Sequence, residues 1–297
     1  WQKRIHFRMG GQWQTLGPSN APKRLNAVVT GQRFYPYAVR IETIVTVDGK
    51  RINEFCMGVI IGLDAVLTAG HCLHERVDPK VIIYAGVVDW KLENKIVQKI
   101  NAKDFLVHKD YQEECDVGPD HYCFNVNDIA IVWTEKKFKL GNNLRIATLN
   151  RDLKKPFGKK GRIVGWGYTG KPEPPTMLQK GLVKVVRKGE CQNFNTDILI
   201  QDTMMCLAPV TKNTRASRGD SGGPFVIDGV VHGISSITIF DSASRKKFMG
   251  LFTCVAEYRM WIGNNLSRGP PKERLPKSSR KPGNSRTKYN TENSAFN

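Results

Sequence analysis

Short apolar segments separated by turn residues run through the middle of the chain. Segments of four to nine residues bounded by glycine, proline, asparagine or aspartate are typical of β-strands rather than helices. The first half of the chain is therefore predicted to be built from strands. They are expected at residues 39–47, 57–61, 65–68 and 81–85.

A second group of such segments follows after residue 160, and it ends in a different pattern. Residues 256–266 have the apolar spacing of a helix and form the one long helical stretch that the pattern predicts. Two groups of short strands with so little helix are typical of an all-β sandwich or barrel. The second group of strands is expected at residues 162–164, 181–186, 224–227, 230–235 and 250–255.

The two ends of the chain lack this periodicity. Residues 1–27 contain five basic residues and no acid, and they are predicted to form a flexible basic extension. Residues 267–297 contain eight basic residues and two acids among proline and serine, which predicts a disordered basic tail. The lysine-rich residues 151–162 are expected to connect two halves of a globular part that spans residues 28–266.

Composition adds a strong positive charge to this picture. The 297 residues are 40% hydrophobic, enough for a core, and carry a net charge of +19. Such a charge favours a polyanionic partner such as a heparin-like glycan, although basic runs are usually only solvated surface. Nucleic acid is not expected, because aromatic residues are not interleaved with the basic ones. No run approaches the 18 or so apolar residues of a membrane helix.

The most informative segment for chemistry is Arg218-Gly219-Asp220-Ser221-Gly222-Gly223-Pro224. A serine flanked by glycines and preceded by a carboxylate indicates an exposed hydroxyl on a tight turn, where backbone N–H groups can converge on an oxyanion. Two other segments, Leu67-Thr68-Ala69-Gly70-His71-Cys72 and Asn127-Asp128-Ile129-Ala130-Ile131-Val132, add a base and an acid. The chain order is therefore His, Asp, Ser.

These three motifs resemble those of the chymotrypsin/trypsin family of serine proteases, from about Val28 to Leu266. Gly165-Trp166-Gly167 lies where the family has a Gly-Trp-Gly turn. The resemblance implies two packed antiparallel six-stranded β-barrels with a C-terminal helix, and a boundary near residues 145–160. It also implies a secreted, extracellular hydrolase, insect-like and made as a zymogen. Its partners would be protein or peptide substrates and protease inhibitors, with no cofactor or metal.

The resemblance assigns a role to each motif residue. His71 would act as general base, Asp128 would orient its imidazole, and Ser221 would be the nucleophile. The backbone N–H groups of Gly219 and Ser221 would form the oxyanion hole. His74, His108, His121 and His232 lack the same flanking sequence, and we interpret them as surface or packing residues.

The specificity pocket departs from the family pattern. The resemblance places Arg215, six residues before Ser221, at the floor of the primary pocket, where a cation would favour an acidic residue before the scissile bond if the guanidinium points inward. Ser236-Ile237-Thr238 replaces the Ser-Trp-Gly common on the opposite wall. Thr238 is expected to narrow the pocket mouth. Acidic residues are our first prediction for the preferred substrate, and small apolar residues our second.

Activation in this family implies a cut that frees an α-amino group to pair with the buried carboxylate before the nucleophile, here Asp220. Lys23-Arg24 is a natural site for a trypsin-like activator and would release Leu25 as the new terminus. Val28 looks more like the family's mature terminus, but the residue before it is Ala27. The sequence alone does not decide between cleavage after Arg24 and cleavage before Val28.

Seven cysteines at spacings that suit disulfides indicate an oxidising compartment. The resemblance implies that Cys56 pairs with Cys72, and Cys191 with Cys206. Cys115 and Cys123 would then most simply close an acidic loop, residues 113–123, which either overhangs the cleft and restricts substrates or is only a surface loop. Cys254 is left as a buried thiol or, less favoured, an intermolecular bridge.

Two functions are compatible with these residues. The first is an active serine endopeptidase with an altered pocket. The second is a catalytically silent binding or regulatory protein of the same fold, with a doubtful activation terminus and a basic surface for a polyanion. The complete set of His71, Asp128 and Ser221 favours the enzyme, because a silent protein has no chemical need for all three.

Overall fold

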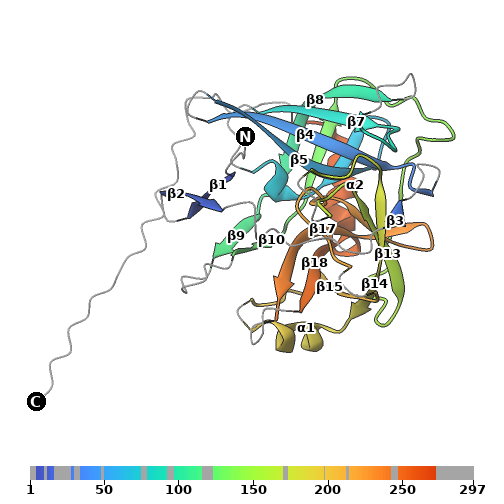
Figure 1. Cartoon of the computed structure of the whole chain (residues 1–297). Helices are drawn as coiled ribbons and strands as arrows, with labels where there is room; N and C mark the ends of the chain where they lie inside the picture. Colours follow the sequence, from blue (N-terminus) through green and yellow to red (C-terminus); the bar gives the residue numbers. More distant parts are fainter. Residues whose placement is uncertain are drawn as a thin grey trace, which may run out of the picture.

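A computed structural model of the chain (Figure 1) shows two groups of strands and a C-terminal helix, as the sequence predicts, together with elements that it did not predict. It describes the backbone alone of residues 5–9, 12–16 and 28–29. It describes residues 34–47, 50–74, 79–91, 97–115, 123–169, 173–196, 198–211, 214–241 and 247–271 more fully, except for the side chains of residues 46, 47, 115 and 123. Most of the predicted extension and tail therefore lies outside the described residues.

The first half forms a closed antiparallel barrel. Its strands are ordered β11-β6-β5-β4-β7-β8, and β8 pairs with β11 to complete the ring. The alternating side chains point inward to a core that includes Ile41, Leu67, Ile83 and Ile131, all fully buried. The strands are β4 (Ala38–Val47), β5 (Lys50–Ile60), β6 (Ala65–Thr68), β7 (Lys80–Ala85), β8 (Gln98–Val107) and β11 (Ala130–Thr134).

The second half forms a second barrel, which closes where β17 pairs with β18. Its core includes Ile163, Val183, Phe225 and Phe252. The short strands β12 (Thr148–Leu149) and β3 (Val28–Val29) add to the same sheet outside the ring. The ring consists of β13 (Lys160–Gly165), β14 (Gln179–Val186), β15 (Met204–Pro209), β16 (Pro224–Ile227), β17 (Val230–Phe240) and β18 (Phe248–Cys254). The all-β fold with two six-stranded barrels is confirmed.

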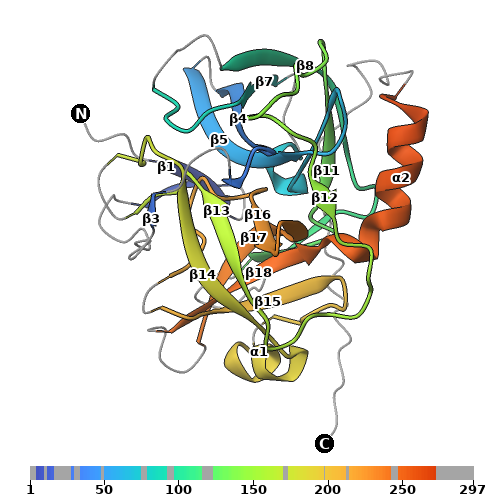
Figure 2. The same ribbon diagram turned by 90° about the vertical axis from the view of Figure 1, so that its right-hand side faces the viewer.

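The helix predicted at residues 256–266 is present, with shifted bounds. A 3-10 turn, η3 (Val255–Tyr258), leads into α2 (Arg259–Arg268), which packs beside the first barrel (Figure 2) through Ile262 and Trp261. A second, short helix, α1 (Lys188–Phe194), was not predicted, because its seven residues carry a single buried side chain, Cys191. Among the described residues, no helix is long and apolar enough to span a membrane.

Two hairpins lie outside the barrels. β1 (Ile5–Met9) pairs with β2 (Gln12–Leu16), so part of the N-terminal extension has regular structure that its composition did not predict. β9 (Gln112–Cys115) pairs with β10 (Cys123–Val126) at the base of the predicted acidic loop.

The predicted disulfides are confirmed where the structure describes them. Cys56 is bonded to Cys72, and Cys191 to Cys206. The Cα atoms of Cys115 and Cys123 are register partners in the β9–β10 hairpin, but their side chains lie outside the described ones, so that bridge stays a prediction. Cys254 is a buried free cysteine, as favoured from sequence, and burial raises the pKa of its thiol.

Candidate active site

His71 lies in a 3-10 turn, η2 (Gly70–Cys72), immediately after β6. The disulfide from Cys72 to Cys56 ties this turn to β5. Glycine is needed at position 70, because a Cβ there would lie 2.9 Å from the Tyr111 ring and 3.3 Å from the carboxylate of Asp128. The disulfide at Cys72 and the close packing around Gly70 therefore hold the turn in place.

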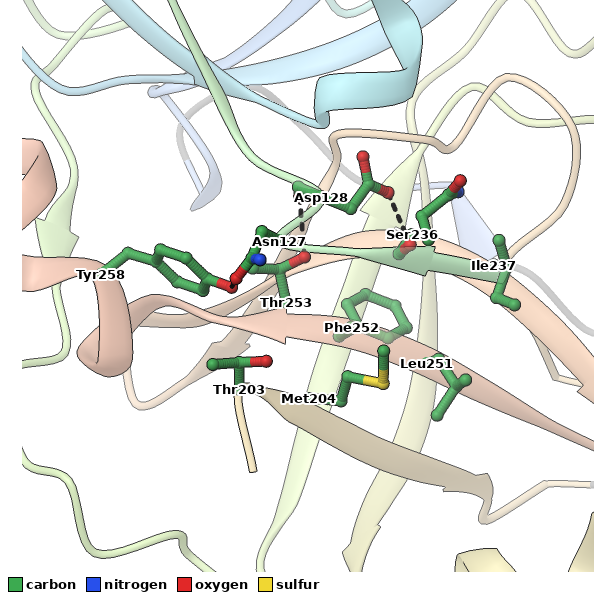
Figure 3. Close-up of a pocket in the computed structure, with 11 residues that line it drawn as sticks. Asn127, Asp128, Thr203, Met204, Ser236, Ile237, Leu251, Phe252, Thr253 and Tyr258 are labelled. Atoms are coloured by element: carbon green, nitrogen blue, oxygen red, sulfur yellow. Dashed lines mark hydrogen bonds between the residues drawn. The ribbon is translucent and has the colours of Figure 1, made fainter. Parts of the chain in front are cut away.

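Asp128 lies between β10 and β11, and hydroxyl groups from β18 and η3 hold it and its neighbour Asn127 (Figure 3). The Thr253 hydroxyl donates to the Asp128 carbonyl at 2.7 Å, and the Tyr258 hydroxyl donates to the side chain of Asn127 at 2.7 Å. Asn127 has a φ of 51°, in the left-handed region that asparagine tolerates better than most residues. The two barrels thus meet at this residue.

The carboxylate of Asp128 faces His71 and contacts it twice, once at the imidazole and once at the backbone. Nδ1 of His71 lies 2.8 Å from Oδ2, and the backbone N–H of His71 donates to Oδ1 at 2.9 Å. The hydroxyl of Ser236 on β17 donates to Oδ2 at 2.5 Å (Figure 3). Sequence reasoning assigned Ser236 only to the pocket wall and missed this bond, since nothing in the local pattern distinguishes a serine that faces Asp128.

The pKa of Asp128 is lowered despite its burial, at 1% exposure. Burial acts to raise the pKa and is the largest single influence. The positive charge of His71 and the hydrogen bonds from His71 and Ser236 together outweigh it. The carboxylate is therefore an ionised acceptor at neutral pH, as an orienting group for imidazole requires.

Ser221 lies on a turn that is packed against the segment before His71. The Ser221 carbonyl accepts a hydrogen bond from the Met57 N–H at 2.7 Å, and Met57 is the neighbour of the bridged Cys56. At Gly222, with a φ of 79°, a Cβ would collide with the Met57 carbonyl and lie 3.2 Å from the Ala69 nitrogen. The turn that carries Ser221 therefore packs against β5 and against the end of β6, the strand that His71 follows.

Asp220 is 3% exposed and is held by backbone donors. The N–H of Gly167 donates to Oδ1 at 2.8 Å, and the N–H of Ser217 donates to Oδ2 at 2.9 Å. A Cβ at Gly165 or Gly167 would collide with this carboxylate. The Gly-Trp-Gly segment therefore needs its glycines to admit Asp220.

Arg215 and Thr238, the residues predicted to shape the primary pocket, are linked through Ala216, the residue that follows Arg215. The Arg215 guanidinium carbon is 4.4 Å above the ring of Phe248, and its buried Nε has no hydrogen-bond partner among the described residues. Partial burial lowers the pKa of Arg215. The Thr238 hydroxyl donates to the Ala216 carbonyl at 3.0 Å, which links Thr238 to the neighbour of Arg215, and the narrowed pocket mouth stays a prediction. A small pocket (Figure 3) adjoins this region and is lined in part by Asp128, Ser236, Met204 and Leu251.

The remaining described histidines pack against aromatic rings. His74 lies 4.5 Å from the Tyr111 ring, His108 lies 5.4 Å and 5.2 Å from the rings of Tyr258 and Trp261, and His232 lies 6.5 Å from that of Phe225. His121 falls outside the described residues. Among the described residues, the group with metal-ligand proximity is Cys56, His71 and Cys72, but its two sulfurs are joined in the disulfide.

Comparisons with known proteins agree with this geometry. A family profile described as Trypsin matches residues 28–262. Proproteinase E of Bos taurus is 31% identical over 254 residues, which cover 81% of this chain and 95% of that protein. Trypsin of Sarcophaga bullata is 27% identical over 80% of this chain and 87% of its own. Chymotrypsin of Phaedon cochleariae is 26% identical over 79% of this chain and 80% of its own.

Solved structures show the same fold. A structure titled "Structure of GrC" is 25% identical, with a TM-score of 0.67, and the match covers 82% of this chain and 99% of that one. Neuropsin, described as a serine protease expressed in the limbic system of mouse brain, is 24% identical with a TM-score of 0.64 over 82% of this chain and 99% of its own. The second likeness concerns the fold alone.

Proposed function

The chain belongs to the trypsin family of serine proteases, and from that premise we propose that it hydrolyses peptide bonds with His71, Asp128 and Ser221. The observation that carries the proposal is the bond of 2.8 Å between the imidazole and an ionised, buried Asp128. With the ring proton on Nδ1, facing Asp128, the imidazole has its unprotonated lone pair on Nε2, which can accept the Ser221 proton. The same bond stabilises the imidazolium once the proton has moved.

The reaction follows from these positions in two steps. The Ser221 oxygen attacks the peptide carbonyl carbon while its proton passes to Nε2 of His71, which then gives the proton to the leaving amine as the C–N bond breaks. Water, deprotonated by the same imidazole, hydrolyses the acyl-enzyme and restores Ser221. The N–H groups of Gly219 and Ser221 would hold the oxyanion, each contributing about 3 kcal/mol to the transition state. Gly219 has a φ of 90°, which a non-glycine residue rarely adopts.

For substrate choice, the proposal is an acidic residue before the scissile bond. Arg215 supports it, because its guanidinium lacks an acid partner among the described residues and rests only on the Phe248 ring. The bond between Thr238 and Ala216 argues against large side chains. Small apolar residues are our second expectation for this substrate position, because they too would fit a narrow pocket mouth.

Strand pairing favours one of the two activation sites. Val29 is opposite Gln179, which is opposite Gly165, and Gly165 adjoins the Asp220 carboxylate. The step from Val29 to Gly165 crosses two strand spacings, which together measure about 10 Å. A terminus at Leu25 is four residues before Val29 and so has about 13 Å of reach when extended. A terminus at Val28 would be held in the sheet beyond β14, so we propose cleavage after Arg24.

The proposed function is tested with a serine-directed phosphonate probe, applied before and after limited trypsin treatment. We expect covalent labelling of the processed wild-type protein and none of Ser221→Ala. Labelling should depend on a terminus at Leu25, which N-terminal sequencing identifies. Equal absence of label in both proteins under both conditions would favour a silent protein instead.

A second candidate function, polyanion binding, is favoured by the outer face of β13 and β14, which lie side by side in Figure 2. Lys160 is opposite Lys184 in the register, with Arg162 two residues along, and all three are exposed. Like charges directly opposite destabilise a sheet, and none of these three has an ion pair among the described residues. We expect retention on heparin that falls steeply with salt and weakens in the double variant Lys160→Gln, Lys184→Gln. If the double variant were retained on heparin as strongly as wild type, this face would be excluded as the polyanion-binding surface.

A further inference from the structure

The connector between the two barrels places an exposed aromatic side chain among lysines. Residues 153–160, here named the connector turn, read Leu153-Lys154-Lys155-Pro156-Phe157-Gly158-Lys159-Lys160. We propose that the connector turn and the cations beside it bind the surface of an anionic bilayer, with the ring of Phe157 inserted at the boundary between headgroups and acyl chains. The inference does not depend on the proposed catalysis, and its test does not need an active enzyme.

A type II turn holds Phe157 at the protein surface. The N–H of Lys159 donates to the Pro156 carbonyl at 3.1 Å, and Gly158 has a φ of 78°, as the third residue of such a turn requires. Phe157 directly precedes this glycine, and 42% of its surface is exposed. A Cβ placed on Gly158 would meet none of the described atoms within 4 Å, so the end of the turn projects from the molecule.

Backbone hydrogen bonds to β14 fix the connector turn. The N–H of Gly158 donates to the Val185 carbonyl at 2.9 Å, and the N–H of Val185 donates to the Lys159 carbonyl at 3.0 Å. Within the turn, the N–H of Phe157 donates to the Lys155 carbonyl at 2.9 Å. Because the turn is ordered before any partner arrives, it would lose little conformational entropy on binding.

Cations from neighbouring elements lie beside Phe157. The guanidinium carbon of Arg187, the residue before α1, is 5.4 Å from the centroid of the Phe157 ring. Lys160, at the start of β13, is opposite Lys184 of β14. Figure 2 shows the connector entering β13 beside α1. The exposed basic residues of this group that have no ion pair within the described part of the chain are Lys154, Lys159, Lys160, Lys184 and Arg187.

The acidic residues of the same surface neutralise only part of this charge. The Asp202 carboxylate lies 2.9 Å from Nζ of Lys188, and the Asp202 carbonyl accepts from Nζ of Lys155 at 2.5 Å. The carboxylates of Asp152 and Glu190 accept hydrogen bonds from backbone N–H groups of the same surface. Seven basic residues against three acids leave a local charge of +4. The surface therefore attracts anions even with its internal pairs in place.

The combination of an apolar ring with cations favours a bilayer over a soluble polyanion. Lysine and arginine bind a sulfated glycan as well as anionic headgroups, so the charge alone does not distinguish the two partners. A glycan offers no apolar layer, and binding to it would leave Phe157 in water. A bilayer accepts an aromatic ring at its interface and deforms around a projecting turn. Phe157 is therefore the residue that decides between these partners.

The connector turn lies away from the candidate active site. β13 begins at Lys160 and ends at Gly165, where a Cβ would collide with the Asp220 carboxylate. A strand of six residues spans about 16 Å between its ends. Binding to a bilayer through the connector turn is therefore expected to leave the hydrolysis of a small soluble peptide unchanged.

The test is co-sedimentation of the full chain with phosphatidylcholine vesicles that contain about 30% phosphatidylserine. We expect Phe157→Ser to lower the partition coefficient about tenfold, and Phe157→Leu, which stays apolar, to keep most of it. The double variant Lys154→Gln, Lys159→Gln should also lower it about tenfold, because each cation near an anionic surface adds to the affinity. Vesicles of phosphatidylcholine alone should bind the wild-type protein much more weakly.

Two matched variants remove the same chemical groups elsewhere. Phe34→Ser removes a phenylalanine that is 70% exposed and lies 5.4 Å from Nζ of Lys180. Lys136→Gln, Lys137→Gln removes two exposed cations that follow β11. Both should partition as the wild-type protein does. Every variant keeps the basic segments 1–27 and 267–297, so a difference between variants reports on the connector turn.

Heparin retention separates a bilayer from a glycan as the partner. Phe157→Ser has the charge of the wild-type protein, so it should elute from heparin at the same salt concentration while its partition into vesicles falls. Its thermal unfolding should match that of wild type, which excludes misfolding as the cause. Equal partition of wild type and Phe157→Ser would overturn the proposal and, with heparin retention intact, would assign the surface to a glycan. A loss in Phe34→Ser as large as that in Phe157→Ser would also overturn it.

Vesicle binding and catalysis can fail separately. Ser221→Ala should partition into the vesicles as the wild-type protein does, whether or not the wild type hydrolyses peptides. A silent protein that binds vesicles through Phe157 would leave this inference standing, whereas an active enzyme that ignores them would overturn it.

Discussion

Replacing Asp128 by asparagine is expected to lower kcat by about four orders of magnitude, a loss of the size associated with this triad. Asparagine presents an amide where His71 Nδ1 now meets an ionised oxygen at 2.8 Å. The imidazole would then favour the tautomer in which Nε2 carries a proton and cannot accept another. Steady-state hydrolysis of a peptide substrate measures the loss, and a drop of less than tenfold would contradict the role assigned to Asp128.

Unfolding measured against pH is the control for this substitution. Because the pKa of Asp128 is lower in the folded protein, its carboxylate contributes stability above the ordinary aspartate pKa of about 3.9 and loses that contribution as pH falls through the folded value. Wild type should therefore lose stability relative to Asp128→Asn between pH 5 and pH 2. At neutral pH the variant should remain folded, since the Thr253 bond is made to the Asp128 backbone. Parallel stability curves would mean that the carboxylate is not preferentially ionised in the fold.

Replacing Thr238 by glycine is expected to raise kcat/KM for substrates with a large residue before the scissile bond by about 10- to 100-fold. The substitution removes both the side chain at the pocket mouth and its bond to the Ala216 carbonyl. If the Arg215 guanidinium reaches the opened pocket, the gain should be greater for Glu than for Gln. A peptide library assayed on both proteins gives the comparison.

Two matched variants separate the causes of that effect. Thr238→Val keeps the bulk of the side chain but loses the hydrogen bond, so it should leave the pocket narrow and the profile close to wild type. Arg215→Ala in the Thr238→Gly background should remove any preference for Glu over Gln. A profile that favours Lys or Arg in the parent protein would contradict the reading of Arg215.

Much of this architecture follows from patterns that are local in sequence. Strands β4, β6 and β7 are short apolar runs between turns, and they lie where the pattern predicts them. β8 was not predicted, because polar residues such as Lys99, Lys103 and Asp104 interrupt its apolar positions on a half-buried strand. Helix α1 was missed for the related reason that seven residues are too few to show a helical period.

The candidate site shows a similar division. His71, Asp128 and Ser221 lie in motifs that their neighbours define, since the glycines and Cys72 around them serve the turns that present them. The bonds from Ser236 and Thr253 to Asp128 span 108 and 125 residues and have no local signature. The stacking of Arg40 against Phe55 and Trp90 likewise joins two strands and a loop by packing alone. Contacts of this kind emerge only when the barrels are assembled.

The donors that hold Asp128 have a consequence for how this chain could be divided. His71 and Asp128 come from the first half of the chain, while Ser221, Ser236 and Thr253 come from the second, so neither half contains the whole proton-transfer chain that we propose. Fragments separated within the exposed connector around Lys154 would each lack partners that the other supplies. Peptide cleavage would then report whether the fragments have met, which makes this chain a candidate for a split reporter of association.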